Sequence, residues 1–343
     1  MNKQSIQRQI IRAKYEAKRR TKKWKKRKIH NKKLRRLQIQ KHIERIKKGI
    51  INLEAPQNFS FIDNTDEVLK YFNMVKDYVD SNQPVKIDIS KITNLSPDII
   101  ILQIAILRDK KSMRVGIIGN APEDTNLRKI FIESGLYNFV SSRGKMRVAD
   151  NNKLWKHSTN NQVKGEIAGE AVVICKRLFE QNGITYDTDN IYNLLVEAMS
   201  NTINHADKKK ANINWWLYYF IDESKKTIKY SFIDLGIGIF KSASFDSYRR
   251  IANIFFPGNS LLVKPFLEGK IISSRENDNE ISGKGIRQII NCAENPEFIK
   301  FSIITNDQII NVKDKTNQSL NHNFDGTFIH FEVSYSNNIQ NGN

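Results

Sequence analysis

With 343 residues, 39% of them hydrophobic, the chain is long enough for two domains with cores of their own. Its two cysteines, Cys175 and Cys292, exclude a disulfide framework and a cysteine-ligated metal site, and its longest apolar run, Ile99–Leu107, is about half the ~20 residues that a membrane helix needs. The sequence therefore predicts a cytoplasmic protein without a membrane anchor or signal peptide, and its formal net charge of +20 is concentrated almost entirely in residues 1–50.

Residues 1–50 form a basic arm that holds 21 Lys and Arg and only two acids, Glu16 and Glu44. No proline or glycine interrupts the arm before Gly49, which favours a long helix. Like charges at helical spacing repel one another, and an anionic surface relieves that repulsion. We therefore expect the arm to contact DNA or RNA. A membrane surface is the weaker alternative because the apolar residues form no continuous face, and a solvated tail that binds nothing is the third interpretation.

Residues 55–145 alternate strand-like and helix-like segments, which predicts a small α/β domain. Strands are expected at 59–62, 85–90 and 114–119, and helices at 65–81, 96–110 and 125–140. This order resembles STAS-like domains, the family of the anti-anti-sigma factors, which usually carry a phosphorylatable serine or threonine before a helix. Ser96 is the only equivalent here, and its position before Pro97 favours a helix N-cap instead. The polar residues 146–160 are interpreted as a linker.

A second domain is expected over residues 161–335, followed by a short tail at 336–343. It begins with an amphipathic helix near 162–182 and continues with a capped helix at 186–206. The second helix has a core side formed by Ile191, Leu194, Leu195, Ala198 and Thr202. Two strands are predicted after it, at 211–222 and 227–234.

The helix at 186–206 also gathers polar side chains on one face. At 3.6 residues per turn, Glu197, Asn201, Asn204 and His205 lie above one another. Such a face is either exposed to water or turned towards a ligand. For Asn204 and His205, which stand at the end of the helix, a capping role favoured by the helix dipole is the simpler interpretation.

Three segments rich in glycine follow. Asp234, Gly236 and Gly238 end a predicted strand, which brings the backbone close to a ligand, although an ordinary turn explains the motif equally well. Gly283, Lys284 and Gly285 lead into an apolar-periodic helix, whose free N–H groups can hold a phosphate chain. Asp325, Gly326 and Thr327 precede an alternating strand that reaches Val333 and that by itself indicates only a core or edge strand.

Taken in order, these motifs are similar to those of the GHKL ATP-binding fold, which DNA gyrase, histidine kinases and anti-sigma-factor kinases share. The resemblance covers residues 160–335 and implies an α/β (α+β) sandwich, preceded by the STAS-like domain and the basic helical arm. Its implied ligands are ATP and Mg²⁺. It also implies that the segment between Gly238 and Gly283 is a nucleotide lid.

The resemblance assigns a role to each matching residue. Asn201 would bind the Mg²⁺ ion that bridges the phosphates, Asp234 would accept a hydrogen bond from the adenine amino group, and Gly236 and Gly238 would let the backbone pass under the base. Gly283, Lys284 and Gly285 would close over the phosphates, and Thr327 would support the adenine through a water molecule.

Glu197 separates the possible reactions. A carboxylate one helical turn before Asn201 is placed to deprotonate a water or hydroxyl that attacks the γ-phosphate. Histidine kinases usually have no acid at this position, because their nucleophile is a histidine. The residue therefore favours an ATPase or a kinase directed at serine or threonine.

Three functions are compatible with these motifs. An ATPase that acts as a nucleotide-dependent conformational switch in a bacterial regulatory or defence assembly is favoured, because the tethered STAS-like domain lacks a convincing phosphate acceptor. The alternatives are an anti-sigma-type kinase acting on a separate STAS-like protein, and a non-catalytic ATP-binding adaptor. The protein partner is open, and a homodimer is compatible with the family although no coiled-coil heptad requires one.

Overall fold

The computed structural model describes residues 49–140, 154–158, 163–205, 214–244, 258–270, 272–273 and 284–336, together with Arg19, Lys22, Lys23, Lys26 and Arg27 of the basic arm. Those five arm residues are helical. The rest of the predicted arm helix and the tail at 336–343, apart from Ser336, lie outside the described residues. We call residues 49–140 the N-terminal unit and residues 154–336 the C-terminal unit.

The N-terminal unit is built on a three-stranded parallel sheet in the order β1-β3-β5. Its strands are β1 (Ile51–Glu54), β3 (Val85–Asp88) and β5 (Ile117–Gly119), and a second, two-stranded parallel sheet pairs β2 (Asn58–Phe59) with β4 (Asn94–Leu95). Its helices are α2 (Thr65–Asp80), α3 (Asp98–Leu107), α4 (Lys110–Val115) and α5 (Thr125–Glu133), followed by the 3₁₀ turn η1 (Leu136–Asn138). The predicted alternation of strands and helices is confirmed.

Several boundaries in the N-terminal unit differ from the predicted ones. The unit begins with β1, which lies before the expected start at residue 55, and the strand expected at 114–119 starts only after α4, where Gly116 adopts a φ of +93°. The N-cap of α3 is Pro97, without a side-chain hydrogen bond, so the expected cap by Ser96 is wrong. The helix expected at 125–140 ends at Glu133, just before Gly135 turns left-handed with a φ of +82°.

The C-terminal unit contains a five-stranded sheet in the order β11-β12-β8-β7-β6, in which all neighbouring strands are antiparallel. Its strands are β6 (Leu154–Ser158), β7 (Asn214–Asp222), β8 (Thr227–Asp234), β11 (Phe298–Asn311) and β12 (Thr316–Ser334). The predicted linker at 146–160 must be corrected, because residues 154–158 pair with β7 as an edge strand. The fold is therefore mixed α and β, with parallel sheets and an antiparallel sheet.

Helices cover one face of this sheet. They are α6 (Gly165–Gln181), α7 (Asp189–His205), α10 (Ser260–Leu267) and α11 (Lys284–Ala293), accompanied by the short α8 (Ile239–Ser242) and by a small antiparallel pair of β9 (Ala243–Ser244) and β10 (Ile272–Ser273). The predicted core side of α7 is confirmed, since its five members are at most 3% exposed. The four apolar members pack with Leu217, Phe232 and Ile329 of the sheet in one hydrophobic core.

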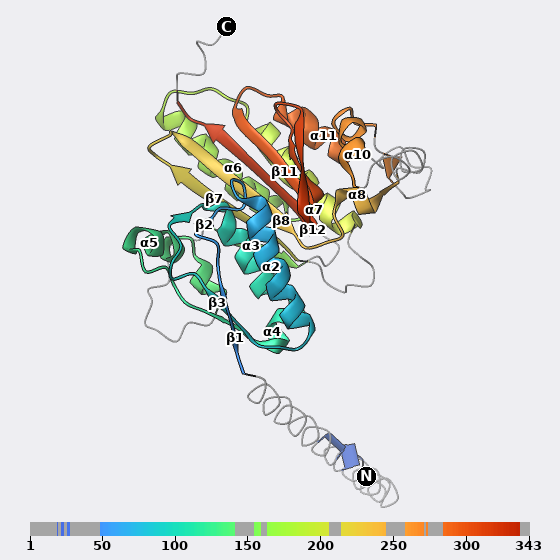
Figure 1. The fold of residues 1–343 in the computed structure, drawn as a ribbon. Coiled ribbons are helices and arrows are strands. Elements are labelled where there is room, and N and C mark those ends of the chain that lie inside the picture. Colours follow the sequence, from blue (N-terminus) through green and yellow to red (C-terminus); the bar gives the residue numbers. More distant parts are fainter. Residues whose placement is uncertain are drawn as a thin grey trace, which may run out of the picture.

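The N-terminal unit covers the opposite face of the same sheet, where α2 and α3 run alongside β8 and β12 (Figure 1). The contact is aromatic: the rings of Phe61 and Phe328 are 4.9 Å apart, and those of Phe139 and Trp216 are 5.2 Å apart. These residues belong to a second hydrophobic core, which the two units share. The five-stranded sheet is thus the middle layer between the helices of the C-terminal unit and the N-terminal unit.

Candidate functional site

A pocket lies between the helix-covered face of the five-stranded sheet and the helices α7, α10 and α11. It has a volume of about 600 Å³, counting its open mouth. Five residues singled out in the sequence line it: Asn201, Asp234, Gly236, Gly238 and Thr327. Most of the other lining side chains are apolar, among them Phe232, Phe266, Ile286, Ile289, Ile303 and Ile329. A largely apolar cavity with a few convergent polar groups is typical of a small-molecule site.

Asp234 is the buried carboxylate of the pocket, at the end of β8 and 8% exposed. Its Oδ1 accepts a hydrogen bond from the backbone N–H of Gly236 at 2.8 Å, and the Thr202 hydroxyl on α7 lies 3.4 Å from its Oδ2. Its register partner on β12 is Thr327. The surrounding chain therefore fixes the orientation of this carboxylate, which gives an otherwise apolar wall a hydrogen-bond acceptor.

Both glycines of the loop after Asp234 lie where an added side chain would collide with another part of the protein. A side chain at Gly236 would place its Cβ 2.7 Å from Oδ1 of Asp234. Gly238 has a φ of +84°, and a Cβ there would lie within 2.7 Å of the Asn306 carboxamide. The backbone conformation at Gly238 therefore favours glycine, and a side chain at Gly236 would displace the Asp234 carboxylate.

Thr305 on β11 joins the two loops that line the pocket. Its hydroxyl accepts a hydrogen bond from the backbone N–H of Ile239 at 2.9 Å and donates one to the carbonyl of Gly326 at 2.9 Å. The side chain is fully buried. The loop that follows Asp234 and the turn that precedes Thr327 are therefore held at a fixed separation.

Asn306 is a second clamp on the same loop. Its carboxamide donates to the carbonyl of Ile237 at 3.0 Å and accepts from the backbone N–H of Phe240 at 3.1 Å. It is buried, and its φ of +53° lies in the left-handed region that asparagine tolerates better than most residues. The sequence carried one signal for this clamp, since an asparagine followed by an aspartate inside an apolar strand predicts a bulge or a turn.

The turn before Thr327 approaches β8 very closely. Gly326 has a φ of +153°, and a Cβ at this position would overlap the carbonyl oxygen of Asp234. This contact places Thr327 directly beside Asp234 in the wall of the pocket. The sequence motifs at 234–238 and 325–327 therefore meet in one place, although they lie far apart in the chain.

The start of α11 packs against the polar face of α7. A Cβ on Gly285 would lie 2.5 Å from Oε2 of Glu197 and 3.1 Å from Oδ1 of Asn201. The first turn of α11 therefore lies against these two groups, and a side chain at position 285 would have to displace the Glu197 carboxylate. Asn201 lines the pocket, whereas Glu197 lies one helical turn away beside it.

Glu197 is partly buried on α7. Burial raises the pKa of its carboxyl group above the ordinary value for glutamate. A carboxylate with a raised pKa is a stronger base once it is ionised. The site thus combines a base, a carboxamide and the N-terminus of a helix.

Part of the predicted site lies outside the described residues. Gly283 is one such residue, and for Lys284, which begins α11, only the backbone is described. The side chains of Asn204 and His205 are likewise not described. The structure therefore brings Glu197 and Gly285 together with the five pocket-lining residues of the prediction.

The predicted lid between Gly238 and Gly283 must be corrected in part. Within this segment, α10 is a helix whose Leu262, Val263 and Phe266 are buried in the core of the C-terminal unit. Phe266 also lines the pocket, so α10 is part of the pocket wall. Residues 245–257, 271 and 274–283 of the expected lid lie outside the described residues.

Within the described ranges, no three His, Cys, Asp or Glu side chains are grouped so that they could hold a metal ion, and no helix is long and apolar enough to cross a membrane. Cys175 and Cys292 are buried free thiols. No protein-family model matches this sequence, and no curated protein matches it either.

Proposed function

We propose that the C-terminal unit is a GHKL-type ATP-binding unit that binds Mg-ATP in this pocket and hydrolyses it, with nucleotide acting as a conformational switch. One observation carries the proposal. Motifs that are remote in sequence converge on a single pocket: Asn201 from α7, Asp234 from β8 and Thr327 from β12, with the glycine-led start of α11 beside them.

The apolar part of the pocket suits an adenine base. Isoleucine and phenylalanine side chains can make apolar contacts with its ring, and Asp234 can accept a hydrogen bond from the exocyclic amino group. Thr327 stands beside Asp234 and can add a hydroxyl to the same end of the base. A buried acceptor of this kind favours adenine over guanine, whose amino group is on a different ring carbon.

The end of the pocket at α7 and α11 suits the phosphates. The free N–H groups at the start of α11 favour an anion, and Lys284 would add positive charge. The carboxamide oxygen of Asn201 is a hard ligand of the kind that Mg²⁺ prefers, and the glycine at position 285 leaves room at this point. A bound Mg²⁺ ion would neutralise charge on the phosphate oxygens.

Glu197 is the residue that would activate the nucleophile. Its carboxylate is on the same side of α7 as Asn201 and has a pKa raised by burial. In this position it would accept a proton from the attacking water, a contribution that is typically worth about 10²- to 10⁴-fold in rate.

Phosphoryl transfer to a separate STAS-like protein is the second candidate function, because Glu197 would deprotonate a serine or threonine hydroxyl as readily as water. Transfer to Ser96 of the same chain is disfavoured. Ser96 precedes α3, which packs on the face of the five-stranded sheet opposite to the pocket. We further propose that the basic arm contacts nucleic acid through its charge.

The proposal is tested by measuring binding of ATP and release of phosphate with Mg²⁺, for the wild type, for Glu197→Gln and for Glu180→Gln. Glu180 is an exposed residue of α6 and serves as the matched control. We expect Glu197→Gln to bind ATP but to lose about 10²-fold or more of the hydrolysis rate, and the control to behave as the wild type. A wild type that binds no ATP would disprove the proposal. A wild type that binds ATP without releasing phosphate would exclude the ATPase and leave the kinase and the ATP-binding adaptor as the remaining functions.

The kinase and the arm each have a direct assay. Label transferred from the γ-phosphate of ATP to a STAS-like protein, in place of release as phosphate, would favour the kinase. For the arm, removal of residues 1–48 leaves β1 intact, since that strand begins at Ile51. We expect this truncation to abolish salt-sensitive binding to DNA and RNA, and unchanged binding would remove the arm from the proposal.

A further inference from the structure

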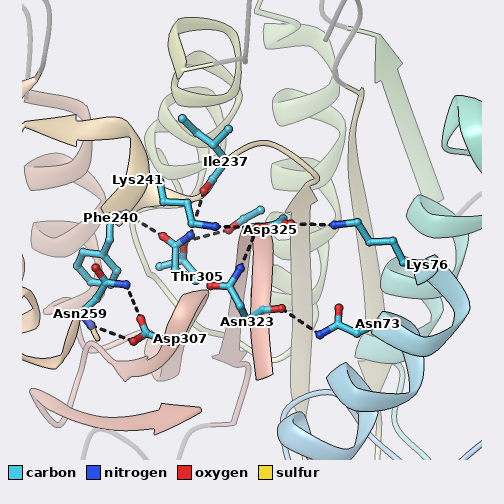
Figure 2. A network of polar contacts seen from close by, with 12 residues as sticks. Asn73, Lys76, Ile237, Phe240, Lys241, Asn259, Thr305, Asp307, Asn323 and Asp325 are labelled. Atoms are coloured by element: carbon cyan, nitrogen blue, oxygen red, sulfur yellow. Dashed lines mark hydrogen bonds and ion pairs between the residues drawn. The ribbon is translucent and has the colours of Figure 1, made fainter. Parts of the chain in front are cut away.

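Asp325 lies where the pocket meets the N-terminal unit. It immediately precedes Gly326 and Thr327 of the pocket wall. Its Oδ2 is 2.8 Å from Nζ of Lys76, which belongs to α2 of the N-terminal unit, and its Oδ1 is 2.9 Å from Nζ of Lys241 on α8. Figure 2 shows the carboxylate between the two lysines. A single side chain therefore connects both units of the chain next to the pocket.

Lys241 belongs to the other loop of the pocket. It is part of α8, which begins directly after Gly238, and the neighbouring residues Ile239 and Ser242 both line the pocket. Asp325 thus makes one ion pair with α8 while its own backbone continues into the turn at Gly326. Thr305 connects the loop after Asp234 to the turn before Thr327 through its hydrogen bonds. The ion pair between Asp325 and Lys241 connects the same two segments a second time.

Lys76 is one of several residues on α2 that contact residues 321–325 of β12. Nδ2 of Asn73 donates to the carbonyl of Asn323 at 3.3 Å, and Asn323 in turn donates to Oδ1 of Asp325 at 2.8 Å (Figure 2). In the first turn of the same helix, the carboxylate of Asp66 accepts hydrogen bonds from the backbone N–H groups of residues 321 and 322. The segment at 321–325 therefore follows α2 and would move with it.

The charges at Asp325 make this connection specific. Burial by itself would raise the pKa of Asp325, but hydrogen bonds from Lys76 and Lys241 outweigh burial and lower the pKa to about 2. The carboxylate is therefore ionised at any pH at which the protein would work. Loss of Lys76 would leave it with Lys241 as its remaining lysine partner.

We infer that Asp325 is a positioning residue of the nucleotide pocket and that the N-terminal unit regulates ATP binding through the contact of Lys76 with Asp325. This inference rests on the function proposed above. With Lys76 in place, Asp325 holds the turn at Gly326 and α8 in the geometry that the pocket needs. When α2 moves away, Asp325 keeps its ion pair with Lys241 but loses the contact that fixes it to the N-terminal unit, and the affinity for ATP falls. Because linkage is reciprocal, bound ATP also stabilises the docked position of α2.

A simpler role for this ion pair would be to hold the two units together without any effect on the pocket. The two roles predict different measurements. A contact that only docks the units would change the stability of the chain but not its affinity for ATP, whereas a positioning contact changes the affinity of the folded protein. The decisive quantity is therefore the Kd for ATP, measured on variants that a melting curve shows to be folded.

The first experiment compares Lys76→Gln with Lys70→Gln in the full chain by titration with Mg-ATP. Lys70 is also on α2, but its carboxylate partner is Glu67 of the same helix at 3.8 Å. We expect Lys76→Gln to raise the Kd about twofold to fivefold, the range of a half-exposed ion pair, and Lys70→Gln to leave it unchanged. Lys76→Arg keeps the charge and should restore most of the affinity.

A double-mutant cycle separates coupling from general damage. Asp325→Asn alone should weaken ATP binding at least as much as Lys76→Gln, and Lys76→Gln should have no further effect once Asp325 is replaced. If the wild type binds ATP and the Kd of Lys76→Gln equals that of Lys70→Gln, the inference is wrong while the proposed function stands. If the wild type binds no ATP, the proposed function fails, and the inference with it.

Discussion

The two faces of the five-stranded sheet are both buried, but they are filled in different ways. The face towards the N-terminal unit is closed by interlocking aromatic rings, such as Phe61 against Phe328 and Phe139 against Trp216. The face towards the helices has a comparable core, yet beside Asp234 that core gives way to a pocket with glycine-rich walls. The same sheet is thus packed closely on one side and leaves a pocket on the other.

The largest expected effect concerns the aromatic face. Phe61 is fully buried, and its ring contacts Phe324 at 5.6 Å as well as Phe328. Phe61→Ala removes most of a buried ring between the units, so we expect it to lower the free energy of unfolding by about 3–5 kcal/mol. Chemical denaturation measures this loss. Met74→Ala on α2 is the control, because that side chain is 42% exposed and should change little. An equal effect of the two variants would mean that the aromatic contact does not hold the units together.

The next effect concerns the carboxylate of the pocket face. Asp234→Asn replaces one acceptor oxygen by an N–H donor, which would face the donor amino group of adenine or the Thr202 hydroxyl. We expect the Kd for ATP to rise about 10- to 100-fold, as for the loss of a hydrogen bond to a charged group. Isothermal titration measures it. The matched control is Asp98→Asn, a buried carboxylate on the other face of the sheet, which should leave the Kd unchanged. Equal affinities of wild type and Asp234→Asn would exclude Asp234 from nucleotide recognition.

A smaller effect is expected at the glycine loop. Gly238→Ala forces an alanine into a φ of +84° and against the Asn306 carboxamide, so we expect a loss of about 1–3 kcal/mol in the free energy of unfolding. Gly169→Ala on α6 has no neighbouring atom within 4 Å of the added Cβ and should instead stabilise the helix by about 0.5–1 kcal/mol. Thermal melting of both variants compares them. The requirement for glycine at 238 would be refuted by two alanines of equal effect.

How far the sequence alone predicts the site depends on how local each part of it is. Asp234 and the glycines at 236 and 238 form a short motif directly after an apolar strand, so they can be recognised without knowing the fold. Thr305 and Asn306 could not be found in this way. The hydrogen-bond partners of Thr305 are Ile239 and Gly326, and those of Asn306 are Ile237 and Phe240. All of them are remote in the chain, and each of the two residues fits an ordinary strand or turn by itself.

The arrangement of the two units shows the same limit. The residues of β7 and β8 are apolar on both sides of each strand, with Trp215 and Trp216 both buried, and that pattern is typical of a sheet covered on both faces. The pattern does not tell which part of the chain supplies the second layer. The edge strand β6 is a further example, because a polar segment such as 154–158 becomes a strand only when β7 offers its free edge.

The smallest effect comes from the carboxylate that the aromatic face encloses. Asp98 is almost fully buried at the start of α3, and its Oδ2 accepts a hydrogen bond from the backbone N–H of Ile62 at 2.7 Å. Burial raises the pKa of Asp98, and the nearby His330 opposes that shift without cancelling it. The folded protein therefore holds a proton that the unfolded chain releases above about pH 4. The stabilisation from this proton is complete below that pH and is lost as the pH rises through the raised folded pKa.

Asp98→Asn removes this titration and keeps an acceptor oxygen for Ile62. We expect the variant to match the wild type near pH 4 and to be more stable by about 1 kcal/mol at pH 8, as measured by urea denaturation across that range. Asp88→Asn provides the opposite case, because hydrogen bonds from Ser90, Asn120 and Lys86 hold the pKa of Asp88 well below its usual range. That carboxylate contributes its full stabilisation above about pH 4, so Asp88→Asn should be less stable than the wild type by a constant amount between pH 4 and pH 8. If the stability differences of Asp98→Asn and Asp88→Asn from the wild type change with pH in the same way, burial on the aromatic face does not disfavour ionisation of Asp98.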